Sequence, residues 1–185
     1  MASCSGSTPS AGPQPNFSPN PKHSQLVATA NLDRCPPSQA GTVDGGLPEV
    51  TLPCLGKGPS VQLAGVRGKP MVVNIWGSWC GPCQEETRFL SQVYDDLKPG
   101  VRFLGIDDED DVNSALDFAP HVQPPMRYPS VVDDDKKVLI ALHTSEVPIT
   151  LFVDASGRIV HRNFGPYRDA ASLRSDIAKY LGVNA

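Results

Sequence analysis

Short apolar runs along the chain predict a sheet of buried strands. Residues 71–76 are nearly all apolar, as expected for a central strand that is covered on both faces. Residues 101–106 and 149–153 have the same character and predict two further strands. Between the first two runs, apolar residues recur at helical spacing and predict a helix that ends at Pro99-Gly100; they are Phe89, Leu90, Val93, Tyr94 and Leu97.

The remaining patterns are shorter and predict hairpins and helices around this sheet. Alternating residues within 47–66 surround a Gly-Lys-Gly-Pro turn and predict a small hairpin, and residues 149–164 predict a second one around Asp-Ala-Ser-Gly. A last helix is expected from its N-cap near Asp169 to Gly182. We also expect short helices at 112–119 and 138–143, and a loop with a short strand at 123–132.

The N-terminal part differs from the rest in composition. Residues 1–33 are rich in Ser, Pro, Asn and Gly with almost no apolar periodicity, which predicts a flexible tether. We therefore expect one domain at 34–185 that includes an N-terminal extension. The acidic runs 107–111 and 133–135 are interpreted as solvated loops.

Charge and hydropathy exclude some classes of function. The formal net charge of −4 argues against a general nucleic-acid-binding protein. No stretch approaches the roughly 18 apolar residues of a membrane span. The four histidines are scattered without metal-ligand spacing, so no metal site and no cofactor are expected.

The chemistry of the chain centres on Cys80-Gly81-Pro82-Cys83, which joins the buried strand to the long helix. A cysteine at a helix N-terminus is favoured as a thiolate by free N–H groups and the helix dipole, and the thiolate attacks disulfides. Half of a zinc site and a permanent disulfide are the alternatives. No second ligand pair supports zinc, and the position between a strand and a helix favours a redox pair.

Three cysteines remain outside this pair. Cys35 and Cys54 would close a loop of about 19 residues as a structural disulfide, worth about 3 kcal/mol in the chain-entropy model, and two unpaired thiols are the alternative. Cys4 follows Ala2-Ser3, as at the end of a bacterial lipobox whose signal has been removed. This favours a lipidated Cys4 that anchors the protein to a membrane, against an ordinary cysteine in a tail.

The string Trp79-Cys80-Gly81-Pro82-Cys83 after a hydrophobic strand resembles the active site of the thioredoxin superfamily. The surrounding sequence, over about residues 47–184, is more similar to the extracytoplasmic TlpA/ResA-like branch, which includes cytochrome c maturation proteins. The resemblance implies an α/β thioredoxin fold: a central mixed sheet flanked by helices, with an N-terminal β-hairpin and an inserted helix and strand. It also implies a cis peptide bond at Val147-Pro148.

The resemblance suggests roles for the residues near the pair. Cys80 is expected to attack and Cys83 to resolve the mixed disulfide, with Glu86 exchanging a proton with Cys83; a surface glutamate paired with Arg88 is the alternative for Glu86. Asn74 stands where cytosolic thioredoxin has a buried Asp. Substrate is expected to contact Trp79, Gly81, Pro82, Val147 and Pro148. Arg88 departs from the family, which often has a helix-kinking Pro there.

The sequence therefore predicts a monomeric, lipid-anchored, extracytoplasmic thiol–disulfide oxidoreductase that reduces protein disulfides. Family resemblance makes apocytochrome c the leading substrate and implies a membrane thiol donor that reduces the protein again. A disulfide oxidase or isomerase of exported proteins is one alternative. A module that delivers Cu(I) on soft thiolates is another.

Overall fold

The molecule is built on a five-stranded mixed sheet in the order β5–β4–β3–β6–β7. The computed structural model describes residues 21–184. Strands β3, β4 and β5 are parallel, whereas β6 runs antiparallel to both of its neighbours. The strands are β5 (Ser130–Asp133), β4 (Arg102–Asp108), β3 (Met71–Trp76), β6 (Ile149–Val153) and β7 (Ile159–Phe164).

Helices and a second, two-stranded sheet surround the central one. β1 (Thr51–Leu52) pairs antiparallel with β2 (Val61–Gln62) and forms the expected hairpin. The order of elements along the predicted domain agrees with the sequence patterns. The helices are α1 (Pro21–Ala30), α2 (Gly81–Leu97), α3 (Val112–Phe118), α4 (Lys137–Ala141) and α5 (Ala170–Leu181), with short 3₁₀ turns η1 (Leu63–Gly65) and η2 (Ala119–His121).

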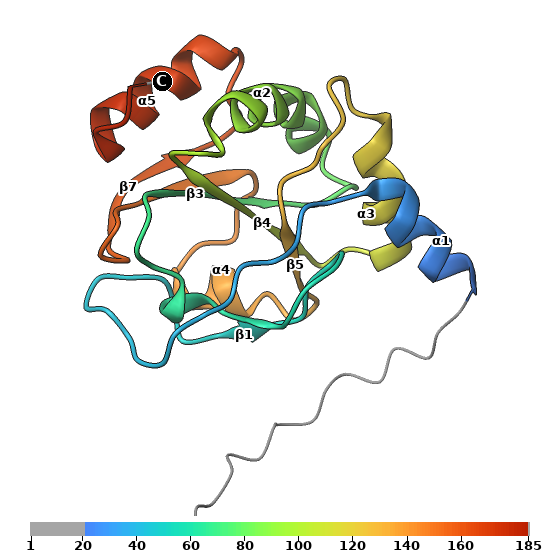
Figure 1. Ribbon diagram of the computed structural model, residues 1–185, viewed down its shortest axis with the longest axis horizontal. Helices are drawn as coiled ribbons and strands as arrows, with labels where there is room; N and C mark the ends of the chain where they lie inside the picture. The colour runs from blue at the N-terminus through green and yellow to red at the C-terminus, as the bar shows by residue number, and fades with distance from the viewer. Residues whose placement is uncertain (1–20, 185) are drawn as a thin grey trace, which may run out of the picture.

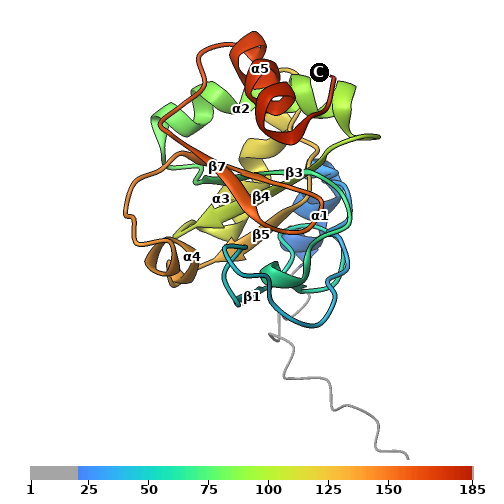
Figure 2. The same ribbon diagram turned by 90° about the vertical axis from the view of Figure 1, so that its left-hand side faces the viewer.

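The sheet separates two hydrophobic cores. α2, α3 and α5 cover one face, and α4 and the β1–β2 hairpin cover the other (Figures 1 and 2). Every residue of β3 is buried, because both faces of this strand are covered. The C-terminal end of β3 is therefore a rigid base for the loop that carries the two cysteines.

The prediction of a flexible tether is wrong for residues 21–33. Residues 21–30 form α1, which packs against α3, with Leu26 and Val27 half-buried against the core and Leu32 buried. Asn31 follows the helix with a positive φ of 48°, a conformation that Asn tolerates. The apolar stripe is too narrow to stand out in a polar sequence. Cys4 and the rest of the expected tether lie outside the described residues.

The interpretation of both acidic runs as solvated is wrong in part. Asp107 and Asp108 belong to β4 and are buried. Asp133 is buried at the end of β5, where its carboxylate accepts hydrogen bonds from the N–H groups of Lys137 (3.0 Å) and Val138 (2.8 Å). A carboxylate can thus leave water when backbone donors at a helix start replace its solvent.

A disulfide joins Cys35 to Cys54, with a sequence separation of 19. Cys35 is buried and its N–H donates to the carbonyl of Lys57 at 2.9 Å. Cys54 forms an isolated bridge with Val131 of β5. The disulfide therefore fastens the N-terminal extension to the edge of the central sheet.

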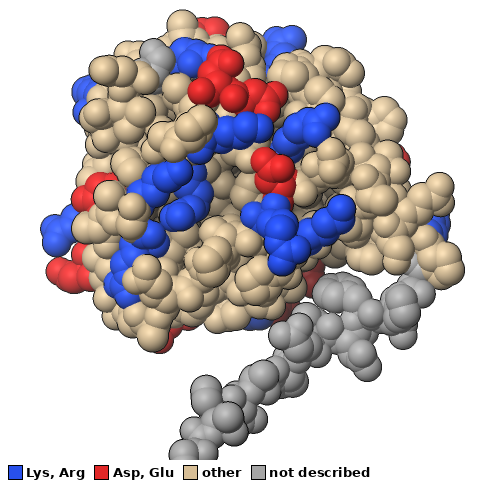
Figure 3. Space-filling model, viewed as in Figure 1, with Lys and Arg blue, Asp and Glu red and all other residues tan. Residues whose placement is uncertain are grey.

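The surface is unevenly charged although the net charge is only −4. Lys and Arg side chains gather over the face drawn in Figure 3, with fewer acidic groups among them. In the described part of the chain, no helix has the length and apolar character that crossing a membrane requires.

We expect the double substitution Cys35→Ala, Cys54→Ala to lower the free energy of unfolding by about 3 kcal/mol, because the unfolded chain regains the freedom of a 19-residue loop. Urea unfolding of the oxidised protein measures this loss. The matched control is Cys80→Ala, Cys83→Ala, which opens a disulfide between positions three apart and should cost less. An equal loss for both variants would contradict the structural role of Cys35–Cys54.

Candidate functional site

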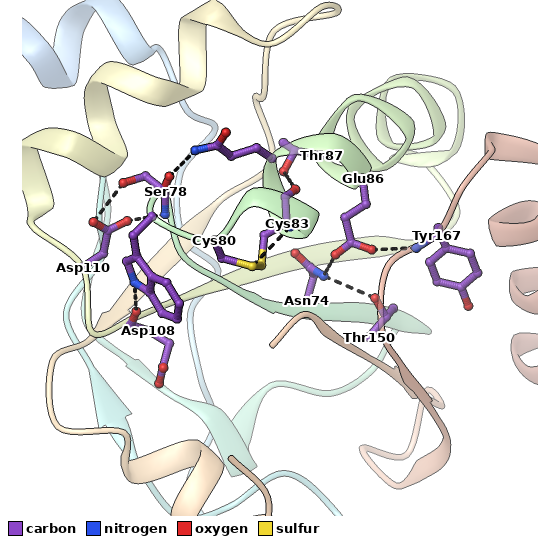
Figure 4. Close-up of a disulfide and its surroundings, with 12 residues drawn as sticks. Asn74, Ser78, Cys80, Cys83, Glu86, Thr87, Asp108, Asp110, Thr150 and Tyr167 are labelled. Atoms are coloured by element: carbon purple, nitrogen blue, oxygen red, sulfur yellow. Dashed lines mark hydrogen bonds between the residues drawn. A yellow bond between two sulfur atoms is a disulfide. The ribbon is translucent and has the colours of Figure 1, made fainter. Parts of the chain in front are cut away.

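The two cysteines lie where β3 passes into α2. Cys80 is the N-cap of α2, and its Sγ accepts a hydrogen bond from the N–H of Cys83 at 3.2 Å (Figure 4). Cys80 and Cys83 form a disulfide, and Pro82 occupies the first turn, where its missing N–H is harmless. After reduction, the same N–H and the positive end of the helix dipole would favour a thiolate on Cys80.

The two sulfurs differ in accessibility. Cys80 retains 5% of its surface exposed and Cys83 none, while Gly81 and Pro82 between them are exposed. Trp79 is 54% exposed beside them, whereas Trp76 is fully buried. Cys80 is therefore the sulfur that a partner reaches first, and Trp79 offers an aromatic surface next to it.

The loop before Cys80 is held by residues that the sequence analysis missed. The carboxylate of Asp110 accepts hydrogen bonds from the N–H and from the Oγ of Ser78. The indole Nε1 of Trp79 donates to the carbonyl of Asp108 at 3.1 Å. A Cβ at Gly77 would lie 2.5 Å from this Nε1, so the loop needs glycine there. β3 and β4 are parallel, so their C-terminal ends lie side by side. The acidic residues that follow the second apolar run could therefore have been placed next to the loop before Cys80.

Val147 and Pro148 stand beside this loop. The peptide bond between them is cis, as expected, and a second cis bond at Gln123-Pro124 was not predicted. Ile149 pairs with Ile75 of β3, which brings Pro148 to the same end of the sheet as the cysteines. Among residues 21–184, no hydrogen bond uses the backbone N–H or C=O of Val147.

Glu86 is buried under the first turns of α2, on the helix face that it shares with Cys83. Its Oε1 accepts from Asn74 Nδ2 at 2.8 Å and its Oε2 from the N–H of Tyr167 at 2.9 Å (Figure 4). Burial raises the pKa of Glu86 to about 7, although these two hydrogen bonds lower it in part. This carboxyl can therefore gain or lose a proton near neutral pH, unlike a surface glutamate.

Further carboxyl groups lie at the end of β4. Burial, together with the negative charges of Asp110, Asp134 and Asp108 and a hydrogen bond to Asp110, raises the pKa of Asp107 to about 9. Burial and the charge of Asp133 raise the pKa of Asp108 to about 6. At neutral pH, a protonated Asp107 at this end of the sheet therefore limits the negative charge close to the redox pair.

The structure gathers most of the predicted site residues at one end of the sheet. Cys35 and Cys54 lie elsewhere, as a structural pair would, and Cys4 is outside the described residues. No group of three or more His, Cys, Asp or Glu side chains within residues 21–184 could hold a metal ion. The gathered residues are Trp79, Cys80, Gly81, Pro82, Cys83, Glu86, Val147 and Pro148.

The fold and the site define the class of protein. A mixed five-stranded sheet flanked by helices, with a Cys-x-x-Cys disulfide at the start of the helix after β3, is a thioredoxin-like fold with a redox-active pair, as predicted. The chain belongs to the AhpC/TSA family, whose model matches residues 43–162.

Named relatives support this class. The thiol–disulfide oxidoreductase ResA of Bacillus cereus is 24% identical over 110 residues, which cover 59% of this chain and 62% of ResA. This chain thus spans less than two thirds of the length of that relative. That relative is named as a thiol–disulfide oxidoreductase, and this chain has a cysteine pair, Cys80 and Cys83, that can form and open a disulfide.

Two solved structures show the same fold. A DsbF homologue from Corynebacterium diphtheriae is 29% identical, with a TM-score of 0.63 over 72% of this chain and 85% of that one. A secreted disulfide oxidoreductase of Mycobacterium tuberculosis, homologous to E. coli DsbE, is 25% identical, with a TM-score of 0.61 over 71% of this chain and 96% of that one.

We expect Glu86→Gln to flatten the dependence of stability on pH. Because the pKa of Glu86 is about 7 in the folded protein against 4.5 ordinarily, its contribution to stability is full below pH 4.5 and lost as pH rises through 7. The loss is about 3 kcal/mol at 1.36 kcal/mol per pKa unit. Urea unfolding of the oxidised protein at pH 4.5 to 8.5 measures it.

The matched control is Glu85→Gln, which changes an exposed carboxyl on the same helix turn. Its stability should follow pH in parallel with the wild-type protein. Asp107 adds its own loss of stability between about pH 4 and pH 9 in all three proteins. The role of Glu86 is therefore read from the difference between the curves of the variant and the wild-type protein. A Glu86→Gln curve parallel to wild type would show that Glu86 titrates as an ordinary surface carboxyl.

Proposed function

We propose that this protein is an extracytoplasmic thiol–disulfide oxidoreductase that reduces disulfides in other proteins. The observation that carries the proposal is the Cys80–Cys83 disulfide at the N-terminus of α2, with Cys80 Sγ accepting the N–H of Cys83. A pair in this position can cycle between disulfide and dithiol, and its first sulfur is activated as a thiolate in the reduced state.

The reaction begins from the reduced protein. The Cys80 thiolate attacks one sulfur of the substrate disulfide, forms a mixed disulfide and releases the other substrate sulfur as a thiolate. Cys83 then loses its proton and attacks Cys80 Sγ, which releases the second substrate thiolate and closes the Cys80–Cys83 disulfide. The substrate gains two electrons and, after protonation, two thiols, while the protein becomes oxidised.

Glu86 is the residue that takes the proton from Cys83. It lies one helical turn after Cys83 on the same face and has a pKa of about 7, so its carboxylate form is available as a base near neutral pH. Asn74 and the N–H of Tyr167 hold both of its oxygens in place. The amide of Asn74 does not titrate near neutral pH, so we assign the proton transfer to Glu86.

The substrate docks along Val147 and Pro148. The backbone N–H and C=O of Val147, which have no hydrogen-bond partner among residues 21–184, suit pairing with an extended substrate segment, as in β-augmentation. Such a segment places its cysteine next to Cys80, with Trp79, Gly81 and Pro82 as the surrounding exposed surface. Trp79 is oriented for this contact by its hydrogen bond to Asp108.

The proposed location is outside the cytoplasm, with a lipid on Cys4 as anchor. Structural disulfides such as Cys35–Cys54 persist in oxidising compartments, which supports export. The secreted oxidoreductase of M. tuberculosis supports it as well. Apocytochrome c, with its paired cysteines, is the proposed substrate, and a membrane thiol donor reduces the protein after each cycle.

We expect the Cys80–Cys83 pair to have a reduction potential close to the value of about −270 mV of thioredoxin. Equilibration with dithiothreitol buffers and trapping of free thiols measures it, and the trap also counts whether Cys35 and Cys54 stay protected. A potential near the value of about −120 mV of DsbA would refute the reducing role and favour an oxidase.

Two matched variants connect this potential to the mechanism. Cys83→Ser should accumulate the mixed disulfide with a disulfide substrate, because no second thiol resolves it. Cys80→Ser should form none, because Cys83 is fully buried. Tight stoichiometric binding of Cu(I) by the reduced protein, without exchange with any disulfide, would instead favour the delivery module.

A further inference from the structure

A pocket of about 240 Å³ opens beside the redox pair, between α2 and the loop before α5. Tyr167 lines this pocket, and Asp108 accepts the hydrogen bond of Trp79. In Figure 4 these two residues lie on opposite sides of the two cysteines, so the pocket is on the side of the disulfide away from Trp79. The lining residues are Pro82, Glu85, Arg88, Phe89, Pro166, Tyr167 and Arg168.

The pocket begins at the active site itself. Pro82 lies between the two cysteines, and Pro82, Glu85 and Phe89 share one face of α2 because they are three and four residues apart. From Pro82 to Phe89 the helix rises by about 10 Å. An extended substrate advances about 3.3 Å per residue, so its side chains reach the pocket within about three residues of a cysteine bound at Cys80.

The charges of the pocket are predominantly positive. Arg88 and Arg168 are both exposed, and neither forms an ion pair with any residue of the described part of the chain. The guanidinium of Arg88 lies 4.5 Å from the ring centre of Phe89, which limits its freedom without neutralising it. Glu85 is the one acidic residue of the lining, and the positive end of the α2 dipole partly offsets its negative charge.

We infer that this pocket selects protein substrates that carry an acidic side chain within about three residues of the target cysteine. The inference rests on the proposed function, since it names the substrates of that same site. Arg88 and Arg168 provide two guanidinium groups, each of which can donate paired hydrogen bonds to one carboxylate. A carboxylate at this distance would form an ion pair with guanidinium groups that have no ion-pair partner in the described part of the chain.

Exchange rates with matched peptides test the selection. Two synthetic peptides carry the same internal Cys-x-x-Cys disulfide and differ only at the three positions on each side, which hold glutamates in one and lysines in the other. Stopped-flow tryptophan fluorescence, to which Trp79 beside the disulfide contributes, follows their reaction with the reduced protein at low salt. The wild-type protein should react faster with the glutamate peptide, and 0.5 M salt should reduce this preference.

The ratio of the two rates in each variant is the decisive quantity, because it cancels any change in the reactivity of Cys80. Arg88→Gln and Arg168→Gln should each lower the ratio by about fivefold, as for an exposed charge pair worth about 1 kcal/mol. Arg127→Gln, which removes an exposed arginine outside the pocket, should keep the wild-type ratio. This control separates the pocket from the general field of the other basic groups (Figure 3).

Equal rates for both peptides with the wild-type protein would overturn the inference. So would a double variant Arg88→Gln, Arg168→Gln that keeps the full preference, or an equal fall of the ratio in Arg127→Gln. Failure of the reducing role is a separate outcome: the reduced protein would then reduce neither peptide to a measurable extent. In that case the oxidised protein and the dithiol forms of the same peptides give the ratio, since the encounter at the pocket is the same in both directions.

Discussion

The buried carboxyl of Glu86 connects three parts of the fold at the point where the chemistry takes place. It stands on α2 one turn after Cys83, accepts a hydrogen bond from Asn74 on β3 and another from the N–H of Tyr167 before α5. A carboxylate in this position would be costly without those donors, and two donors reduce the cost without removing it. The result is a proton site whose pKa of about 7 depends on the packing of α2 against the sheet and against the α5 loop.

The same contact shapes the surface next to the active site. Because Tyr167 is held by Glu86, its neighbours Pro166 and Arg168 are placed opposite the exposed face of α2 and close the pocket that contains Arg88. The hydrogen bond between Tyr167 and Glu86 thus positions both the proposed proton acceptor and the pocket wall at which we propose that substrates are selected. On the other side of the disulfide, Asp110 and Asp108 hold Ser78 and Trp79 in a similar way.

Much of this arrangement could be predicted from the sequence because its signals are local. The all-apolar strand 71–76, the Cys-Gly-Pro-Cys turn and the helical stripe after it each depend on neighbouring residues, and the structure has all three. The acidic residues at the end of β4 were misjudged because their burial depends on pairing between strands distant in sequence. Helix α1 was missed for a related reason: Leu26, Val27 and Ala30 are stabilised by α3 rather than by a strong pattern of their own.

Arg88 shows how one position can serve two demands. Where thioredoxin-like proteins often have a proline, this chain has a residue that continues α2 without a break to Leu97 and retains its N–H. Glu86 and Leu90 occupy the buried face of the helix, whereas the Arg88 side chain is exposed and lines the pocket beside the loop before α5. A buried carboxyl with a pKa of about 7 and exposed guanidinium groups outside are compatible, because water screens the exposed charges while the pKa of the carboxyl is set mainly by its own burial. The proposed proton exchange at Cys83 and the proposed recognition of the substrate can therefore be adjusted separately, although both depend on the first two turns of the same helix.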